Sequence, residues 1–247
     1  MMEIGSPSWL EIIVQGAARM GLTVSPGQAH QFAVHGKSLL EWNQKINLTT
    51  INKPEQIAVK HFLDAIVPLD RLPAQGRLLD IGTGGGFPAL PLKVMRPDLS
   101  MTLIDGIRKK VNFVKHVIRL LGLADIQALQ VRAEALVHDK GWSGGFEIIV
   151  CRALADLEDV LDLAVPLLAP QGCIIAYQGP QQSGSAPDDN DGTILTHGAR
   201  RFRTTIHHYR LPYIGDPRSI TIIEPAPYNP TDSTNSMNPT DPSGAGR

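Results

Sequence analysis

The sequence from residue 77 onward alternates between short apolar runs and segments of helical periodicity, and this rhythm limits the fold more than any other feature. Strands that alternate with helices in this way indicate a parallel sheet with right-handed crossovers. The expected strands cover residues 77–82, 100–106, 126–134 (with a short helix at the end), 145–154 and 172–179, and the expected helices cover 86–97, 107–123 and 157–172.

Two flanking regions complete the expected architecture. Residues 199–212 and 218–225 are strand-like with no helix between them, which predicts an antiparallel hairpin. Residues 8–45 are predicted to be helical, with Ser25 and Pro26 as a cap and first-turn pair, and another helix is expected within 52–69, with Pro54 in its first turn. We therefore predict an α/β chain: a helical extension over residues 1–68, a Rossmann-like, mostly parallel sheet domain over 69–224, an unstructured polar loop at 180–192 and a disordered tail at 225–247.

The composition limits the partners and the compartment. The chain has 23 basic and 24 acidic residues, so that nucleic acid would have to bind at a local basic patch. Cys151 and Cys173 lie in separate apolar runs, as expected of buried thiols in a reducing compartment, and a disulfide would need their strands to be neighbours. The sequence shows no signal peptide and no apolar run of membrane-spanning length, and we expect a cytoplasmic monomer.

A glycine run lies between the first strand and its helix, and it contains Gly82, Gly84 and Gly86. Glycines there allow positive φ angles and let a ligand approach the backbone, which argues against a linker. A dinucleotide fingerprint is met only in its looser form. Asp80, two residues ahead of the run, would repel a pyrophosphate and suits a cationic ligand or an amine. S-adenosylmethionine, which carries a sulfonium and an amino group and no phosphate, is a ligand of that kind.

The second expected strand ends in Asp105, 23 residues beyond Gly82. A carboxylate at that position can accept hydrogen bonds from both ribose hydroxyls of an adenosyl group. Asp105 therefore supports either NAD or S-adenosylmethionine and does not choose between them.

Six segments in order resemble the RsmG (GidB) family of methyltransferases, which modify N7 of a guanine in small-subunit (16S) ribosomal RNA. They are WNQKINLTTINKPEQIAVKHFLDAI, LLDIGTGGGFPALPLKV, LIDGIRKKVNFVKHV, VRAEAL, CRALADLEDVLDLAVPLLAPQG and LPYIGDPRSITIIE, within residues 36–224. The resemblance implies a class I methyltransferase fold, S-adenosylmethionine as cofactor and 16S rRNA or the small ribosomal subunit as partner.

The resemblance also implies site residues. Five residues would contact the cofactor. They are Gly82 and Phe87 in the glycine run, Ala133 and Glu134 in the segment VRAEAL, and Arg152 at the end of the fourth strand. The sequence departs from the family at Gln178, where a lysine is usual, and in the polar loop that follows.

Chemistry at guanine N7 needs little from the enzyme, because N7 bears a lone pair and no proton. We expect alignment of the reactants without a general base, a catalytic triad or a metal. Arg152 is the one candidate catalytic residue, with a role in positioning; its alternative is a structural ion pair, for instance with Glu134. We expect His61, His116 and His138 to be surface or otherwise satisfied histidines.

Cations for RNA occur in three groups, and sequence does not show whether they converge. They are Arg108, Lys109, Lys110, Lys115 and Arg119; Arg200, Arg201 and Arg203; and Lys45, Lys53 and Lys60. Three other functions remain open: a methyltransferase with another substrate, an NAD(P)-dependent Rossmann oxidoreductase, which Asp80 disfavours, and an RNA-binding module without catalysis.

Overall fold

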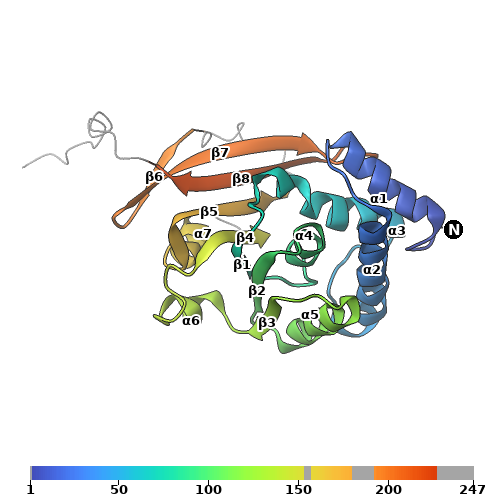
Figure 1. Ribbon diagram of the computed structural model, residues 1–247, viewed down its shortest axis with the longest axis horizontal. Coiled ribbons are helices and arrows are strands. Elements are labelled where there is room, and N and C mark those ends of the chain that lie inside the picture. The colour runs from blue at the N-terminus through green and yellow to red at the C-terminus, as the bar shows by residue number, and fades with distance from the viewer. Residues whose placement is uncertain (1, 153–156, 180–191, 227–247) are drawn as a thin grey trace, which may run out of the picture.

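The structure is a computed structural model that describes residues 2–152, 157–179 and 192–226. Residues 180–191 of the expected polar loop and 227–247 of the expected tail lie outside the described residues. A single sheet runs through the described part in the order β3-β2-β1-β4-β5-β8-β7-β6 (Figure 1). Its strands are β1 (Gly76–Ile81), β2 (Leu99–Asp105), β3 (Ile126–Gln130), β4 (Phe146–Arg152), β5 (Leu168–Gln178), β6 (Ile194–His197), β7 (Arg200–Arg210) and β8 (Pro217–Pro225).

The pairing confirms the predicted mixture of parallel and antiparallel strands. Strands β3, β2, β1, β4 and β5 pair in parallel, and β8, β7 and β6 add to the β5 edge in antiparallel order. Because β1 lies between β2 and β4, the chain reverses its direction of travel across the sheet there. In open α/β sheets, ligands bind at the carboxyl ends of the strands beside such a reversal.

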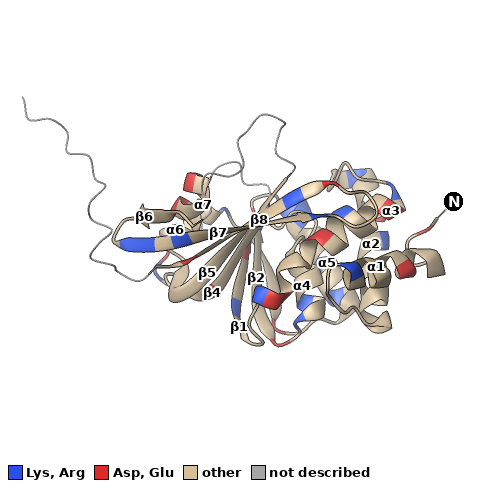
Figure 2. Cartoon of the chain, turned by 90° about the horizontal axis from the view of Figure 1, so that it is seen from above, with Lys and Arg blue, Asp and Glu red and all other residues tan. Residues whose placement is uncertain are grey.

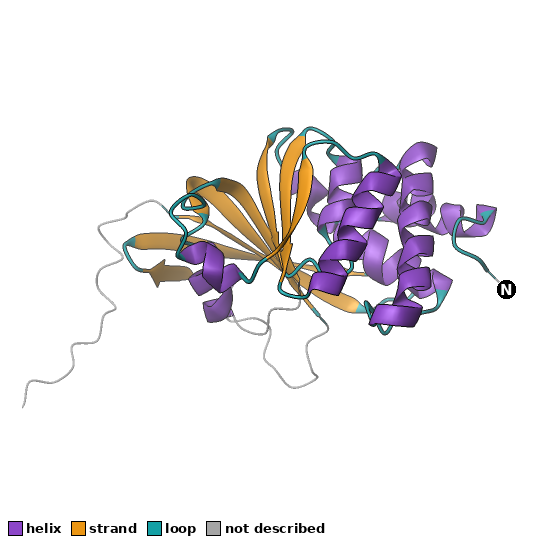
Figure 3. Cartoon of the chain, turned by 90° about the horizontal axis from the view of Figure 1, so that it is seen from below, coloured by secondary structure: helices purple, strands orange, loops and turns teal. Residues whose placement is uncertain are grey.

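Helices cover both faces of the sheet, as the continuous burial of consecutive residues in β1, β2 and β4 requires (Figure 3). One face packs against α4 (Ala89–Met95), α5 (Arg108–Leu121) and the N-terminal helices α1 (Pro7–Arg19), α2 (Pro26–Ile46) and α3 (Pro54–Ile57). The other face packs against α6 (Ala133–Val137) and α7 (Leu157–Ala164). The helices before β1 thus share a continuous core with the sheet.

Local signals in the sequence explain how the N-terminal helices begin. The Ser25 hydroxyl accepts a hydrogen bond from the Gln28 N–H, and the Gln28 side-chain oxygen accepts one from the Ser25 N–H. The two bonds form a capping box at the start of α2, whose first residue is Pro26. Pro54 opens α3, as predicted. The expected continuous helix instead passes into a π-helical turn, η1 (Ala58–Leu63), and a 3₁₀ turn, η2 (Val67–Arg71). Such π-helical turns often occur at functional sites.

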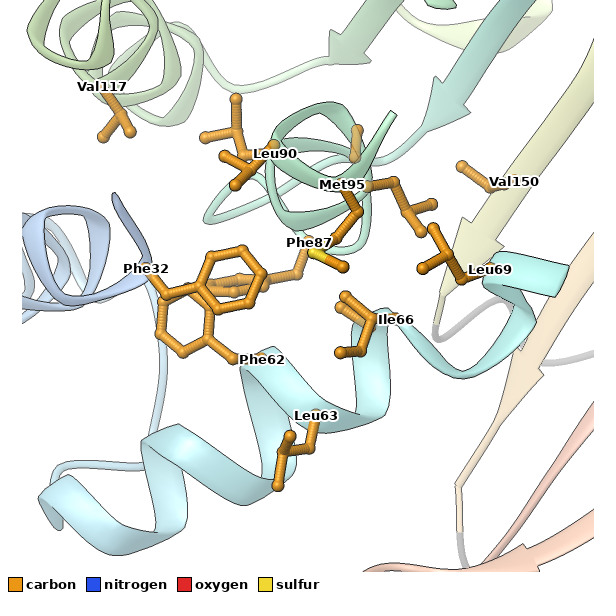
Figure 4. Close-up of a cluster of buried hydrophobic side chains, with 14 of the residues drawn as sticks. Phe32, Phe62, Leu63, Ile66, Leu69, Phe87, Leu90, Met95, Val117 and Val150 are labelled. Atoms are coloured by element: carbon orange, nitrogen blue, oxygen red, sulfur yellow. The ribbon is translucent and has the colours of Figure 1, made fainter. Parts of the chain in front are cut away.

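Aromatic side chains join the N-terminal helices to the glycine run (Figure 4). Phe62 of η1 stacks on Phe32 with 5.0 Å between ring centroids, and it meets Trp9 and Phe87 edge to face. Full burial of each large apolar side chain contributes roughly 1.5–3 kcal/mol. Ile57, Phe62 and Ile66, at helical spacing after Pro54, are all fully buried.

The structure differs from the predicted fold around β5 and β6. The expected helix over 157–172 ends at Ala164, because Pro166 and Pro170 cannot continue it, and β5 already begins at Leu168. Strand β6 was not predicted. The cysteine strands are neighbours, but Cys151 pairs with Ala176 and Cys173 with Ile148.

Three register positions along a strand correspond to about 10 Å, which is too far for a disulfide. Both cysteines are free; Cys151 is buried and Cys173 only partly so.

Candidate functional site

A cavity of about 550 Å³ opens at the carboxyl end of β1 and β4. One wall consists of residues 82–85 with Phe87 and Arg152, and the other consists of residues 47–51 with Leu39 and His61. Its volume falls within the usual range for small-molecule sites, about 300–1,000 Å³. The cavity therefore brings together the glycine run, the end of β4 and the segment that follows α2.

The glycine run adopts the conformation that its composition predicts. Gly82, Gly84 and Gly86 have φ angles of 76°, 55° and 82°, which residues with a Cβ atom rarely adopt. The N–H groups of Gly82 and Thr83 both donate to the Ile104 carbonyl, at 3.0 and 2.9 Å. The run is thus a fixed cradle held against β2. Gly82 and Gly84 line the cavity, whereas Gly86 lies behind it under Leu90.

Asp105 accepts hydrogen bonds from two backbone segments, the glycine run and the start of the loop after β2. Its Oδ2 accepts a hydrogen bond from the Gly84 N–H at 3.1 Å, and its Oδ1 accepts one from the Ile107 N–H at 2.8 Å. Lys110 approaches Oδ2 at 4.0 Å. The carboxylate does not line the cavity itself but touches its wall through Gly84. Each oxygen keeps a second lone pair for a ligand hydroxyl.

Asp80 is fully buried directly before the glycine run. Neither of its oxygens, nor the Thr83 hydroxyl, has a hydrogen-bond partner of good geometry among the described residues. Burial raises the pKa of Asp80 to about 7, although the nearby Thr83 hydroxyl and Ala89 N–H act in the opposite direction. Asp80 does not line the cavity, so the carboxyl group that the sequence predicts to face a cationic or amine-bearing ligand is not exposed to it.

Arg152 is held by the N-terminal segment and not by Glu134. Its Nη2 lies 2.9 Å from Asp64 Oδ2 and donates to the Lys60 carbonyl at 2.7 Å. The Tyr209 hydroxyl donates to the other oxygen of Asp64 at 2.7 Å. The expected alternative of an ion pair with Glu134 is therefore wrong in its partner. Arg152 still lines the cavity, and its side chain is 23% exposed.

The third predicted cofactor segment lies outside the cavity. Ala133 and Glu134 begin α6 after β3, two strands away from β1. Ala133 is buried and Glu134 is exposed. Since β3 is the neighbour of β2, these residues and Asp105 are at adjacent strand ends, where an extended ligand from the cavity would continue.

His61 does not lie on a helix surface, one of the two places that the sequence allows for it. It is buried at the cavity wall, and its ring stacks on Phe87 with 4.7 Å between centroids. Its Nε2 lies 3.0 Å from the Thr49 hydroxyl. Burial and then Arg152 lower the pKa of His61 to about 3, so that the ring is neutral at pH 7. In the sequence, the signal for this position was that His61 directly precedes Phe62, which is fully buried.

One of the three groups of cations, Arg200 to Arg203, lies away from the cavity. Arg200 donates to carbonyls of residues 165–170, and register pairs Arg203 with Glu224, at the end of the hairpin remote from the cavity (Figure 2, left end of β7). Lys60 pairs with Asp216 at 2.8 Å. The start of α5, with Arg108 and Lys109 exposed, does follow the carboxyl end of β2.

At the cavity end of the hairpin lie Arg210 and Arg218 instead, which sequence reasoning missed. Within the described ranges, no group of three or more His, Cys, Asp or Glu side chains is placed to hold a metal ion. No helix in the described part of the chain is long and apolar enough to cross a membrane.

Comparison with known proteins places these features in a family. The family model described as rRNA small subunit methyltransferase G matches residues 28–209. The ribosomal RNA small subunit methyltransferase G of Geobacter sp. (strain M21) is 38% identical over 216 residues, which is 86% of this chain and 96% of the relative. The protein of that name from Streptococcus suis (strain 05ZYH33) is 35% identical over 219 residues, 87% of this chain and 90% of the relative.

A solved structure shares the fold. The SAM-dependent methyltransferase from Aquifex aeolicus aligns with a TM-score of 0.50 at 15% identity, over 72% of this chain and 97% of its own. At that identity the likeness concerns the fold alone. The sequence relatives and the family model together cover most of the chain, and the chain therefore belongs to the rRNA small subunit methyltransferase G family.

Proposed function

We propose that the chain transfers a methyl group from S-adenosylmethionine to N7 of a guanine in 16S rRNA. Membership of the family carries this proposal, and the relatives' name states the RNA on which they act. The site supports it with a cavity of suitable size, a glycine cradle and a carboxyl group beneath the cradle. The chain is an S-adenosylmethionine-dependent methyltransferase with an α/β fold.

The residues present fit this cofactor. Gly82, Gly84 and Phe87 line the cavity, and we infer that Asp80, which is buried directly before the run, acts on the amino-acid end of the cofactor only through the glycine cradle. We infer that Asp105 receives the ribose and that Ala133 and Glu134 lie on the adenine side. When bound, S-adenosylmethionine supplies an electrophilic methyl group on a sulfonium.

The protein's own contribution is placement. Guanine N7 has a lone pair and no proton to lose, so that no general base is required. Arg152 is fixed at the cavity by Asp64 and the Lys60 carbonyl, and we infer that it positions the methionine carboxylate or the RNA. His61 is neutral and partly enclosed, which suits a wall of the site better than a proton carrier.

The helices before β1 belong functionally to the same unit. We infer that residues 1–68 form an extension packed on the methyltransferase domain of residues 69–224, since both contribute to one core and one cavity. Because ribosomal RNA is the proposed substrate, we place the protein in the cytoplasm, acting as a monomer on RNA or on the small subunit.

The test is transfer of a labelled methyl group from S-adenosylmethionine to 16S rRNA and to small subunits from a strain that lacks its own enzyme. We expect label in RNA, with Arg152→Ala strongly impaired. A chain that binds S-adenosylhomocysteine but labels neither substrate would refute the RNA assignment. Labelling of protein or of small molecules would support another methyltransferase, and binding of NAD(P) in place of S-adenosylhomocysteine would support the oxidoreductase.

A further inference from the structure

Two histidines from the N-terminal helices stack on Phe87. The ring centroid of His35, on α2, lies 4.6 Å from that of Phe87 with 14° between the planes. His61, on η1, lies 4.7 Å from it with 18° between the planes. Phe87 closes the glycine run and lines the cavity, whereas His35 is buried and does not line it.

His35 also holds the backbone of the glycine run. Its Nε2 lies 2.8 Å from the Gly85 carbonyl oxygen. Because a carbonyl only accepts, Nε2 carries the hydrogen and donates. Burial lowers the pKa of His35 to about 4, so that the ring is neutral at pH 7.

The second histidine connects the stack to the opposite wall of the cavity. His61 is paired with Thr49, and Thr49 is fixed by Asn43, which accepts from the Thr49 N–H at 2.8 Å and donates to its carbonyl at 2.9 Å. The stacked rings of His35, Phe87 and His61 therefore join the two walls. Their packing sets how the glycine run faces residues 47–51.

An imidazole at a core position of α2 costs desolvation that an apolar ring of similar size would not. The hydrogen bond from Nε2 to the Gly85 carbonyl offsets that cost. Gly85 belongs to the glycine run that forms the cofactor cradle. Resting on the proposed function, we propose that His35 is a positioning residue for the cofactor loop. It acts through the Gly85 carbonyl and the Phe87 ring and does not touch the cofactor itself.

The test compares three variants with the wild type. His35→Phe keeps an aromatic ring for the stack and removes the donor. His35→Gln keeps a donor at about the same distance from Cβ. Phe32→Leu is the matched control, because Phe32 lies one turn away on the same helix, is equally buried and stacks on Phe62.

Each variant is measured by calorimetric titration with S-adenosylhomocysteine, by thermal unfolding, and by KM for S-adenosylmethionine and kcat. We expect His35→Phe to bind roughly tenfold more weakly and to raise KM with kcat within twofold, since one buried hydrogen bond is lost. His35→Gln should bind within about threefold of the wild type. Phe32→Leu should lower Tm while its affinity stays within about twofold.

A His35→Phe affinity equal to that of the wild type would overturn the proposal, as would an equal loss in Phe32→Leu. If His35→Phe does not fold, His35→Leu, which also lacks a donor, is compared with His35→Gln by the same measurements. A wild type that fails to bind S-adenosylhomocysteine would refute the proposed function. Normal wild-type binding and RNA methylation with an unaffected donor-less variant would refute the role of His35 alone.

Discussion

Replacement of Asp105 by Ala tests the assignment of the ribose site. The carboxylate accepts two backbone hydrogen bonds, from Gly84 at 3.1 Å and from Ile107 at 2.8 Å. Hydrogen bonds to charged groups contribute about 1.5–3 kcal/mol each. Water can reach the partly exposed Gly84 and the exposed Ile107, and the Lys110 contact at 4.0 Å adds little. We therefore expect Asp105→Ala to lower the free energy of unfolding by about 2–3 kcal/mol.

The effect on cofactor binding should be larger than instability explains. Two lost hydrogen bonds to ribose hydroxyls, at about 1–1.5 kcal/mol each, correspond to a roughly 30- to 150-fold weaker affinity for S-adenosylhomocysteine. Calorimetric titration well below the variant's Tm measures this. The affinity of Asp105→Asn, which keeps one acceptor oxygen, should lie between those of the wild type and of Asp105→Ala.

Deoxyribose analogues of the ligand separate contact from loop support. The wild type should bind 2′-deoxy- or 3′-deoxy-S-adenosylhomocysteine more weakly than the parent ligand, and Asp105→Ala should no longer discriminate. Binding of the parent ligand by Asp105→Ala within about threefold of the wild type would refute the ribose assignment. So would discrimination that persists in the variant.

Three further predictions concern other residues of the site. Asp64→Ala should destabilise the chain by about 2–3 kcal/mol in urea, because it strands the partly exposed Arg152; a loss no larger than that of Tyr209→Phe would contradict this. Burial raises the pKa of Asp80 from 3.8 to about 7, so between those values the folded chain keeps a proton that the unfolded chain releases, and wild-type stability falls as pH rises. Asp80→Asn should therefore gain over the wild type with pH, from little near pH 4 to on the order of 4 kcal/mol at pH 7 and above, and a gain independent of pH in urea titrations would be inconsistent with that cause. Glu134→Ala should bind S-adenosylhomocysteine roughly fivefold more weakly with unchanged Tm, since Glu134 is exposed; unchanged affinity would remove Glu134 from the site.

The features that the sequence predicted correctly are those set by local chemistry. The capping pair at Ser25, the positive φ angles of the glycine run and the placement of Asp80 and Asp105 at strand ends follow from neighbours in the chain. The alternation of strands and helices likewise fixes which residues meet at the carboxyl edge of a parallel sheet.

The features that sequence reasoning missed depend on partners far away in the chain. Arg152 finds Asp64 across 88 positions, and His35 finds Gly85 across 50. No local periodicity reports such pairs. The periodicity predicts a regular α-helix where η1 forms a π-helical turn. That prediction does not place His61 at the cavity, beside the fully buried Phe62. Arg200 resembled an RNA contact by composition but binds backbone carbonyls.

The proposed target of the methyl group is a single atom, N7 of one guanine in 16S rRNA. The most direct measurement expresses the chain in a strain that lacks its own enzyme of this family and maps modified nucleosides in 16S rRNA by mass spectrometry. We expect 7-methylguanosine at a single position, absent with empty vector and strongly reduced with Arg152→Ala. Unmodified guanine throughout 16S rRNA in cells that contain the folded chain, or a methyl group on another atom, would contradict it.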